Sequence, residues 1–250
     1  MFKPLVAALC LLGAAIPAAT AQQGPPPGAG EAPTGPQLVP PPVRVERAMA
    51  MSAADLAFTY LQVQQLIPTL EFAREPGVRG TVHFEGPEYV VTAGNVDAYI
   101  AAYHGRLEVY RQAMQSRGLP EVGGDYRIEF SSECAGDILD PRELFVVQSA
   151  SGERVPVDTA QLVQAGVEVK FLMEQPDQAL GTFFAGAAVE DTIVFSDELT
   201  LGFALLGTVV DDTVQLRFDV AELRAVFGSD TVSAERWLEL ADCVVTLSPR

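Results

Sequence analysis

The chain has 250 residues, of which 48% are hydrophobic and 20% are charged, a balance typical of globular proteins. Its formal net charge is −17. Nucleic-acid binding needs a cationic surface that displaces counterions, so this charge argues against a nucleic-acid partner. It also argues against an anionic membrane surface, which would repel the protein. The simplest interpretation of the charge is an acidic, solubilising surface.

The first 21 residues have the three parts of a secretory signal peptide. A positive start, "MFK", precedes the apolar run "PLVAALCLLGAAIPAA", and the small residues Ala19 and Ala21 provide a cleavage site after Ala21. The run contains Gly13 and Pro17 and is short for a membrane-spanning helix. We therefore predict a signal peptide over residues 1–21, a periplasmic or secreted location, and no transmembrane helix after cleavage.

A segment rich in proline and glycine follows, from residue 22 to residue 43. Proline removes a backbone donor and glycine loses much conformational entropy on folding, so neither helix nor sheet is favoured. The segment therefore predicts a disordered, mobile linker. A spacer or a proline-rich docking strip is the alternative.

Residues 44–120 are predicted to form a small α/β region. Residues 44–70 favour a helix that stops near Pro68, although the portion "AFTYLQV" could instead be a strand. The segments "RGTVHFEG" and "PEYVVTAG" then indicate two short strands, with a turn at Gly86 and Pro87.

The clearest predicted element is a helix over Val96–Arg117, capped by Asn95 and ended by Gly118 and Pro120. Apolar residues recur along it at three- and four-residue spacing and form one stripe. The stripe consists of Val96, Ile100, Tyr103, Leu107, Tyr110 and Met114. This pattern is typical of core packing, and a partner groove or self-association face is the alternative.

Residues 121–250 are predicted to form a β-rich domain, because the hydrophobic period changes to two from Tyr126 onward. Alternate residues on one face are Tyr126, Ile128, Phe130, Ser132 and Cys134; Val167, Val169, Phe171 and Met173; Val214, Leu216, Phe218 and Val220; and Cys243, Val245 and Leu247. A short helix is expected over residues 233–240. The predicted fold class is α+β, a small helix-containing N-terminal region followed by a mainly antiparallel β-rich sandwich or open barrel.

Removal of the signal peptide would take away Cys10 and leave Cys134 and Cys243. Disulfides persist in an oxidising compartment, and both cysteines lie on the apolar face of the predicted first and last strands of the β-rich domain. We therefore predict a structural disulfide between them, which would add about 4–5 kcal/mol in the chain-entropy model. Two buried free thiols or a reactive pair are the alternatives.

No sequence motif assigns a catalytic, cofactor-binding or metal-binding residue. His83 and His104 fall on different predicted elements, with no cysteine or carboxylate at ligand spacing. The sequence contains no G-x-S-x-G elbow, no phosphate-binding loop, no G-x-G-x-x-G and no C-x-x-C. We expect no cofactor, and we expect Trp237 to lie in the core.

Carboxylates are the remaining candidates for acid–base catalysis or calcium binding. They occur as pairs between predicted strands and as a cluster after Cys134. The residues are Glu190, Asp191, Asp197, Glu198, Asp211 and Asp212 in the pairs, and Asp137, Asp140 and Glu143 in the cluster. Acidic residues at strand ends are more typical of turns that face water.

The sequence therefore predicts an exported, non-catalytic binding or envelope-associated protein. Its partner would be an envelope or extracellular protein or ligand, which the sequence does not identify. One alternative is an exported hydrolase that uses carboxylates at strand-end turns. The other is a structural or assembly protein in which Tyr103 and Tyr110 form a self-association face.

Overall fold

A computed structural model gives the three-dimensional structure of the chain. It describes residues 39–75, 77–82, 89–136, 139–148, 151, 153–175, 178–196, 204–227 and 232–250. The predicted signal peptide and most of the predicted linker lie outside the described residues. Residues Leu38–Arg250 form one compact unit.

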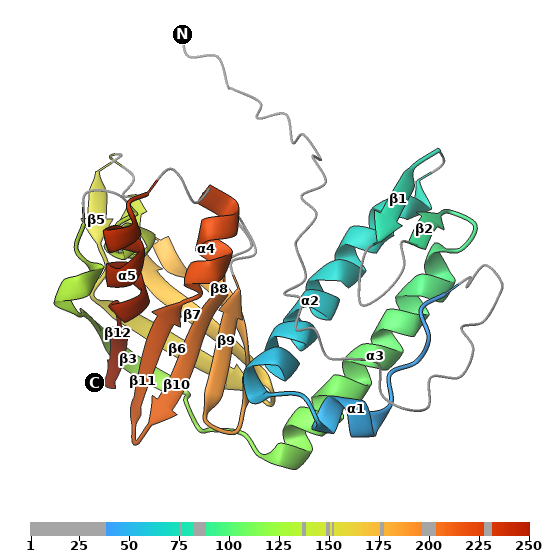
Figure 1. The fold of residues 1–250 in the computed structure, drawn as a ribbon, viewed down its shortest axis with the longest axis horizontal. Helices are drawn as coiled ribbons and strands as arrows, with labels where there is room; N and C mark the ends of the chain where they lie inside the picture. The colour runs from blue at the N-terminus through green and yellow to red at the C-terminus, as the bar shows by residue number, and fades with distance from the viewer. Residues whose placement is uncertain are drawn as a thin grey trace, which may run out of the picture. The chain divides into compact units, whose positions relative to one another are not determined.

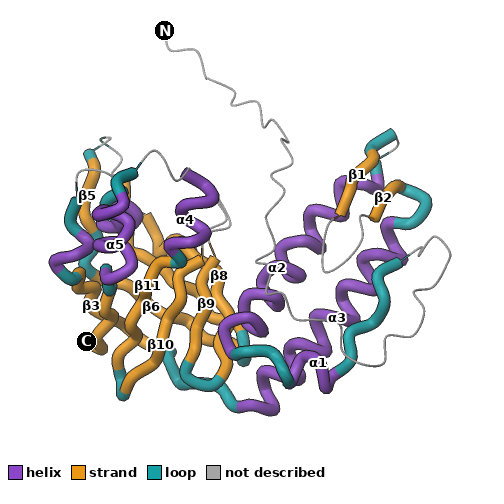
Figure 2. Tube along the Cα trace, viewed as in Figure 1, coloured by secondary structure: helices purple, strands orange, loops and turns teal. Residues whose placement is uncertain are grey.

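Eight of the strands drawn in orange in Figure 2 form a closed antiparallel barrel. Around the barrel they are β3 (Gly124–Phe130), β6 (Thr159–Ala165), β7 (Glu168–Gln175), β8 (Gln178–Val189), β9 (Thr192–Ser196), β10 (Ala204–Val210), β11 (Thr213–Phe218) and β12 (Val245–Pro249). Each strand pairs with the next, and β12 pairs with β3. The α+β class is confirmed. The sandwich or open-barrel detail is not, because pairing between the first and last strands leaves no open edge in this sheet.

The closing pair, β12 with β3, is called the seam below. Its register runs from Val245 opposite Phe130 to Pro249 opposite Tyr126. Alternate residues of β3 are buried and exposed, as expected of a strand with one face toward a core and one toward solvent. The seam therefore presents every second side chain to the outer surface of the barrel.

Apolar side chains fill the described interior of the barrel. The rings of Phe145, Phe171, Phe184 and Phe195 are linked by centroid distances of 5.7 to 6.5 Å. Gly186 makes room for one of them, because a Cβ there would lie 2.5 Å from Cδ1 of Phe195. An eight-stranded barrel is just wide enough to be filled by side chains, and this one follows that rule.

Short elements lie at the end of the barrel where β3 finishes, as the labels β5, α4 and α5 show in Figure 1. They are η2 (Ser132–Cys134), η3 (Pro141–Phe145), the hairpin of β4 (Val146–Gln148) and β5 (Arg154–Pro156), α4 (Val220–Phe227) and α5 (Ala234–Asp242). The helix expected over residues 233–240 corresponds to α5, whereas α4 was not predicted. Trp237 of α5 is 2% exposed and lies in the core, as expected.

The residues before the barrel form a second hydrophobic core around paired helices. Its elements are α1 (Val45–Met49), α2 (Ala53–Glu71), η1 (Phe72–Arg74), β1 (Arg79–Val82), β2 (Tyr89–Thr92) and α3 (Val96–Arg117). Val167, Ala187, Val189 and Val194 of the barrel belong to the same core. The division into domains at residues 120 and 121 stays a prediction.

The predicted helix over residues 44–70 is two helices, α1 and α2. The second begins after Ser52, whose Oγ accepts a hydrogen bond from the backbone N–H of Asp55 at 3.1 Å. It continues past Pro68 to Glu71, so the predicted stop is wrong. Proline removes one internal hydrogen bond, and the buried apolar face of this long helix outweighs that loss.

The helix α3 has the predicted bounds, and its apolar stripe is buried. Asn95 is the N-cap residue as predicted, and its carbonyl accepts from the backbone N–H groups of Ala98 and Tyr99. Its side chain makes no capping hydrogen bond, because Oδ1 accepts from the backbone N–H of Thr92 (2.8 Å) and Nδ2 donates to the carbonyl of Val90 (3.0 Å) in the preceding turn. Among the described helices, none is long and apolar enough to cross a membrane.

Candidate functional site

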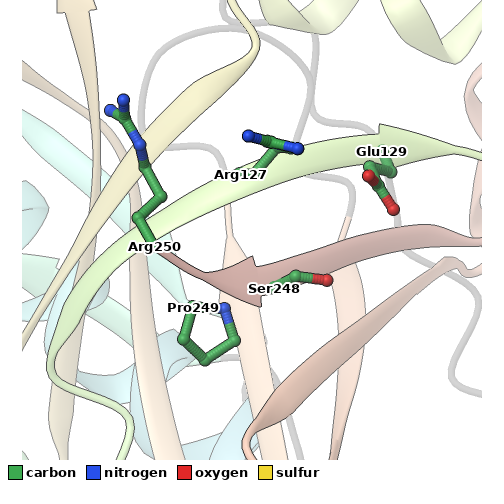
Figure 3. A pocket seen from close by; sticks show the side chains of 5 residues that line it. All are labelled: Arg127, Glu129, Ser248, Pro249 and Arg250. Carbon is green, nitrogen blue, oxygen red and sulfur yellow. The ribbon is translucent and has the colours of Figure 1, made fainter.

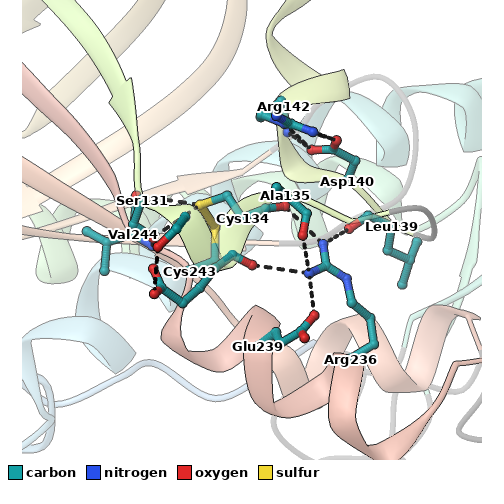
Figure 4. Close-up of a disulfide and its surroundings, with 12 residues drawn as sticks. Ser131, Cys134, Ala135, Leu139, Asp140, Arg142, Arg236, Glu239, Cys243 and Val244 are labelled. Carbon is teal, nitrogen blue, oxygen red and sulfur yellow. Dashed lines mark hydrogen bonds and ion pairs between the residues drawn. A yellow bond between two sulfur atoms is a disulfide. The ribbon is translucent and has the colours of Figure 1, made fainter.

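Cys134 and Cys243 lie beside the seam at disulfide-bonding distance. Their sulfur atoms are 2.11 Å apart and their Cα atoms 4.6 Å apart, across a sequence separation of 109 residues. Cys134 ends η2, which follows β3, and Cys243 is the C-cap of α5, which precedes β12. Both cysteines were predicted to lie in strands. Neither does, because the chain leaves the sheet at both points. The bond joins the segment that follows β3 to the residue that ends α5, just before β12 (Figure 4).

Arg236 of α5 holds the irregular segment that contains Cys134 (Figure 4). Its guanidinium is almost fully buried and donates to four backbone carbonyls and one carboxylate. The acceptors are the carbonyls of Glu133 (3.1 Å), Cys134 (2.9 Å), Ala135 (3.0 Å) and Leu139 (3.0 Å), and Oε2 of Glu239 (2.9 Å). Carbonyls outside regular structure need such partners when water is excluded. Arg236 and these acceptors are called the Arg236 clamp.

Two smaller features fit the chain around the clamp. A Cβ at Gly136 would lie 2.3 Å from Cζ of Arg236, so only glycine leaves room for the guanidinium. Ser131 donates its backbone N–H to the carbonyl of Val244 (3.0 Å), and its Oγ accepts from the N–H of Val244 (3.1 Å). The seam is thereby extended to the disulfide. The sequence carried no signal for the clamp, because most of its acceptors are backbone atoms.

A hollow of about 400 Å³ lies on the outer surface of the seam (Figure 3). Its lining is Arg127, Glu129, Ser248, Pro249 and Arg250. In the register, Arg127 is opposite Ser248, and the backbone N–H of Arg250 donates to the carbonyl of Asp125 (3.0 Å) beyond the end of β12. This hollow is called the seam hollow.

The guanidinium groups of Arg127 and Arg250 have no ion pair or hydrogen bond within the described parts of the chain. Other arginines are paired with carboxylates; they include Arg74, Arg111, Arg117, Arg142 and Arg154. Two available cations thus lie together in a protein whose net charge is −17. Sequence analysis missed this site, because only the strand register brings the two residues together.

The carboxylates predicted as candidates are divided between the two ends of the barrel. Residues 190–191 and 211–212 form turns at the end where β3 begins, here called the turn end. Asp140 and Glu143 follow β3 and therefore belong to the opposite end, here called the clamp end. Asp137, Asp197 and Glu198 lie outside the described residues.

Ion pairs occupy several of these carboxylates. A hydrogen bond from Arg142 lowers the pKa of Asp140, and a hydrogen bond from Arg117 lowers the pKa of Glu190. Glu143 pairs with Arg154. A lowered pKa keeps a carboxylate ionised, which suits ion pairing better than proton donation. Among the carboxylates that the structure describes, no contact favours the hydrolase alternative, which stays a prediction.

The remaining titratable residues are the two histidines and the buried Tyr60. His104 is exposed on α3, and His83 lies outside the described residues. Tyr60 of α2 donates to Oε1 of Glu168 at 2.8 Å and accepts from Arg111 at 3.3 Å, and burial raises its pKa to about 12. Across the described ranges, no three His, Cys, Asp or Glu side chains are placed to hold a metal ion.

No protein-family model, curated protein or solved structure matches this chain. Function must therefore be argued from the geometry of the chain itself. Two features stand out: the cross-linked clamp end of the seam, and the arginines of the seam hollow, which have no partner among the described residues.

Proposed function

We propose that this protein is an exported, non-catalytic binding protein that engages its partner through the outer face of the seam. The observation that carries the proposal is the seam hollow, where the unpaired guanidinium groups of Arg127 and Arg250 lie on the two strands that close the barrel. The partner is an envelope or extracellular protein or ligand.

The rigidity of the seam supports this proposal. The disulfide and the Arg236 clamp hold one end of the strand pair, and the bond from Arg250 to Asp125 extends the ladder at the other. The backbone of such a frame loses little conformational entropy when a partner binds, so more of the contact energy is available as affinity. Because side chains fill the described interior, the outer surface is the part of the barrel that a partner meets.

The composition of the outer face also supports it. Thr246 lies opposite both Glu129 and Gln215, so polar side chains continue from β3 across β12 to β11. Hydroxyl, amide and guanidinium groups in one plane offer directional hydrogen bonds to a partner. The proposal of export rests on the N-terminal pattern and on the compartment in which disulfides persist.

Site-specific photo-cross-linking tests the binding surface. A photoreactive amino acid at Thr246 places the probe on the seam, and the same amino acid at His104, exposed on α3, is the matched control. In cells that produce the full chain, we expect a discrete adduct from the Thr246 position and none from the His104 position. Adducts from neither position, or equally from both, would contradict binding through the seam.

Mass spectrometry tests the export. We expect the exported chain to begin at Gln22 and to gain two alkyl groups only after reduction. A chain recovered in the cytoplasm with its first 21 residues and alkylated without reduction would contradict export.

A further inference from the structure

We propose that the seam hollow binds a carboxylate group, with Arg127 and Arg250 donating to its oxygens. This inference rests on the proposed function, because it names the chemistry that the same surface recognises. The register of β3 and β12 brings the two arginines close together. Arg127 is opposite Ser248, and Arg250 follows two residues later on the same face, so the two arginines are diagonal neighbours.

Diagonal neighbours on paired strands have Cα atoms about 7–8 Å apart, within reach of long side chains. Figure 3 shows both arginine side chains extending on the same side of the strand pair. Two guanidinium groups can therefore approach one anion from different directions. The planar guanidinium fork matches a carboxylate with two parallel N–H···O bonds. The Ser248 hydroxyl, which also lines the hollow, can add a further donor.

The backbone beneath these side chains is fixed. Arg127 is paired on both sides, with Ser248 of β12 and with Thr159 of β6. Arg250 is held by its hydrogen bond to the carbonyl of Asp125. Only the side-chain torsions of the arginines remain to be ordered by a ligand, which limits the entropic cost of binding.

Glu129 weakens the preference that two arginines alone would have for a doubly charged anion. It is a third charged residue in the lining, and it repels a phosphate dianion more than it repels a single carboxylate. A hydroxyl or ammonium group next to the ligand carboxylate can instead donate to Glu129.

An NMR titration of the ¹⁵N-labelled full mature chain tests this assignment. The probes are sodium lactate, which is a free hydroxy acid, and an acetylated, amidated Gly-Asp-Gly peptide, whose carboxylate is a side chain. Sodium phosphate and sodium chloride are titrated at the same ionic strength, because the net charge of −17 makes anion binding salt-dependent. We expect saturable shifts of the Arg127 and Arg250 Nε–H signals with lactate or the peptide, and the stronger of these two identifies the source of the carboxylate.

Variants give the test its controls. Arg127→Gln and Arg250→Gln should each weaken carboxylate binding about tenfold or more, because each removes a charge-assisted hydrogen-bonding group. Arg217→Gln, an exposed arginine of β11 outside the hollow, should leave it unchanged. Glu129→Gln should increase phosphate affinity relative to carboxylate affinity. Equal shifts with chloride, tighter binding of phosphate to the wild type, or carboxylate binding that survives both arginine substitutions would overturn the proposal.

The experiments can contradict the proposed binding surface and the proposed carboxylate site independently of each other. In one outcome, the Arg127→Gln/Arg250→Gln variant still forms the adduct at Thr246, and the wild type shows no carboxylate-induced NMR shifts. This outcome would support the binding surface and contradict the carboxylate site. Carboxylate shifts that require both arginines, without any adduct at Thr246, would keep the site and remove the proposed surface for a partner.

Discussion

The two ends of the barrel are closed by different kinds of interaction. At the turn end, neighbouring strands are joined by short turns, in which Glu190 and Asp211 have positive φ angles of 56° and 53°. At the clamp end, the decisive contacts join residues far apart in sequence. Arg236 is 102 residues from Cys134, and the two cysteines are separated by 109. Short turns join neighbouring strands at one end, and cross-links between distant residues tie the first and last strands of the barrel at the other.

Along the seam, the residues that stabilise the fold and the residues proposed to bind a partner therefore lie at different places. Closing a long loop costs more conformational entropy than closing a short turn, so the clamp end needs cross-links where the turn end does not. The seam hollow, in contrast, extends from the middle of the seam to the end of β12, and its lining includes neither cysteine nor Arg236. Changes at the clamp should therefore alter the free energy of unfolding, and changes at the hollow should alter binding.

Removal of the disulfide should have the largest effect. For a separation of 109 residues, the chain-entropy model gives about 4–5 kcal/mol of stabilisation. The variant Cys134→Ala/Cys243→Ala should lose a free energy of this order, measured by urea unfolding of the mature chain. The reduced wild type is the matched control and should be destabilised by a similar amount. A double variant as stable as the oxidised wild type would show that the clamp end does not depend on this bond.

Removal of the clamp arginine should come next. Arg236→Met keeps much of the buried volume but leaves four carbonyls without their donor, and we expect a loss of about 3 kcal/mol. Glu239→Gln is the control, because the Glu239 side chain is half exposed and the carbonyl contacts remain. Equal unfolding free energies for Arg236→Met and Glu239→Gln would mean that the ion pair, and not the carbonyl network, matters at this position.

The sequence predicted features that depend on neighbouring residues better than features that depend on pairing. The helix α3 was predicted with its observed bounds, since its apolar stripe is a local pattern. The inward-facing residues of β11 were also predicted, since alternation needs only the strand itself. Closure of the barrel could not be predicted, because it depends on which strand, distant in sequence, pairs with β3.

The functional residues follow the same division. The cysteine pair could be proposed because two cysteines in an exported chain have few possible partners. Arg236 could not be recognised, since its acceptors are mainly carbonyls, which every residue carries. Arg127 and Arg250 are 123 residues apart by number (250 minus 127), and only the β3–β12 register makes them neighbours.

The turn end should respond more weakly to substitution. Asp211 occupies the left-handed region, which costs a non-glycine residue about 1 kcal/mol. Asp211→Gly should therefore raise the free energy of unfolding by up to about 1 kcal/mol, and Asp211→Val should lower it. Circular dichroism during thermal unfolding measures both. A loss of stability in the glycine variant would show that the Asp211 side chain does more than form the turn.

The smallest effect should come from the exposed pair of Glu190 with Arg117, and pH makes it measurable. The hydrogen bond from Arg117 lowers the pKa of Glu190 in the folded protein below its unfolded value. A carboxylate of this kind contributes stability that is fully present above its unfolded pKa, about 4.3, and is lost as pH falls through the folded pKa. The difference in unfolding free energy between the wild type and Glu190→Gln should thus be small at pH 7 and vanish in acid. In the Arg117→Met variant, NMR titration should give Glu190 an ordinary pKa. A difference that persists below the folded pKa would show that the Glu190 side chain stabilises the turn end by something other than its charged pair with Arg117.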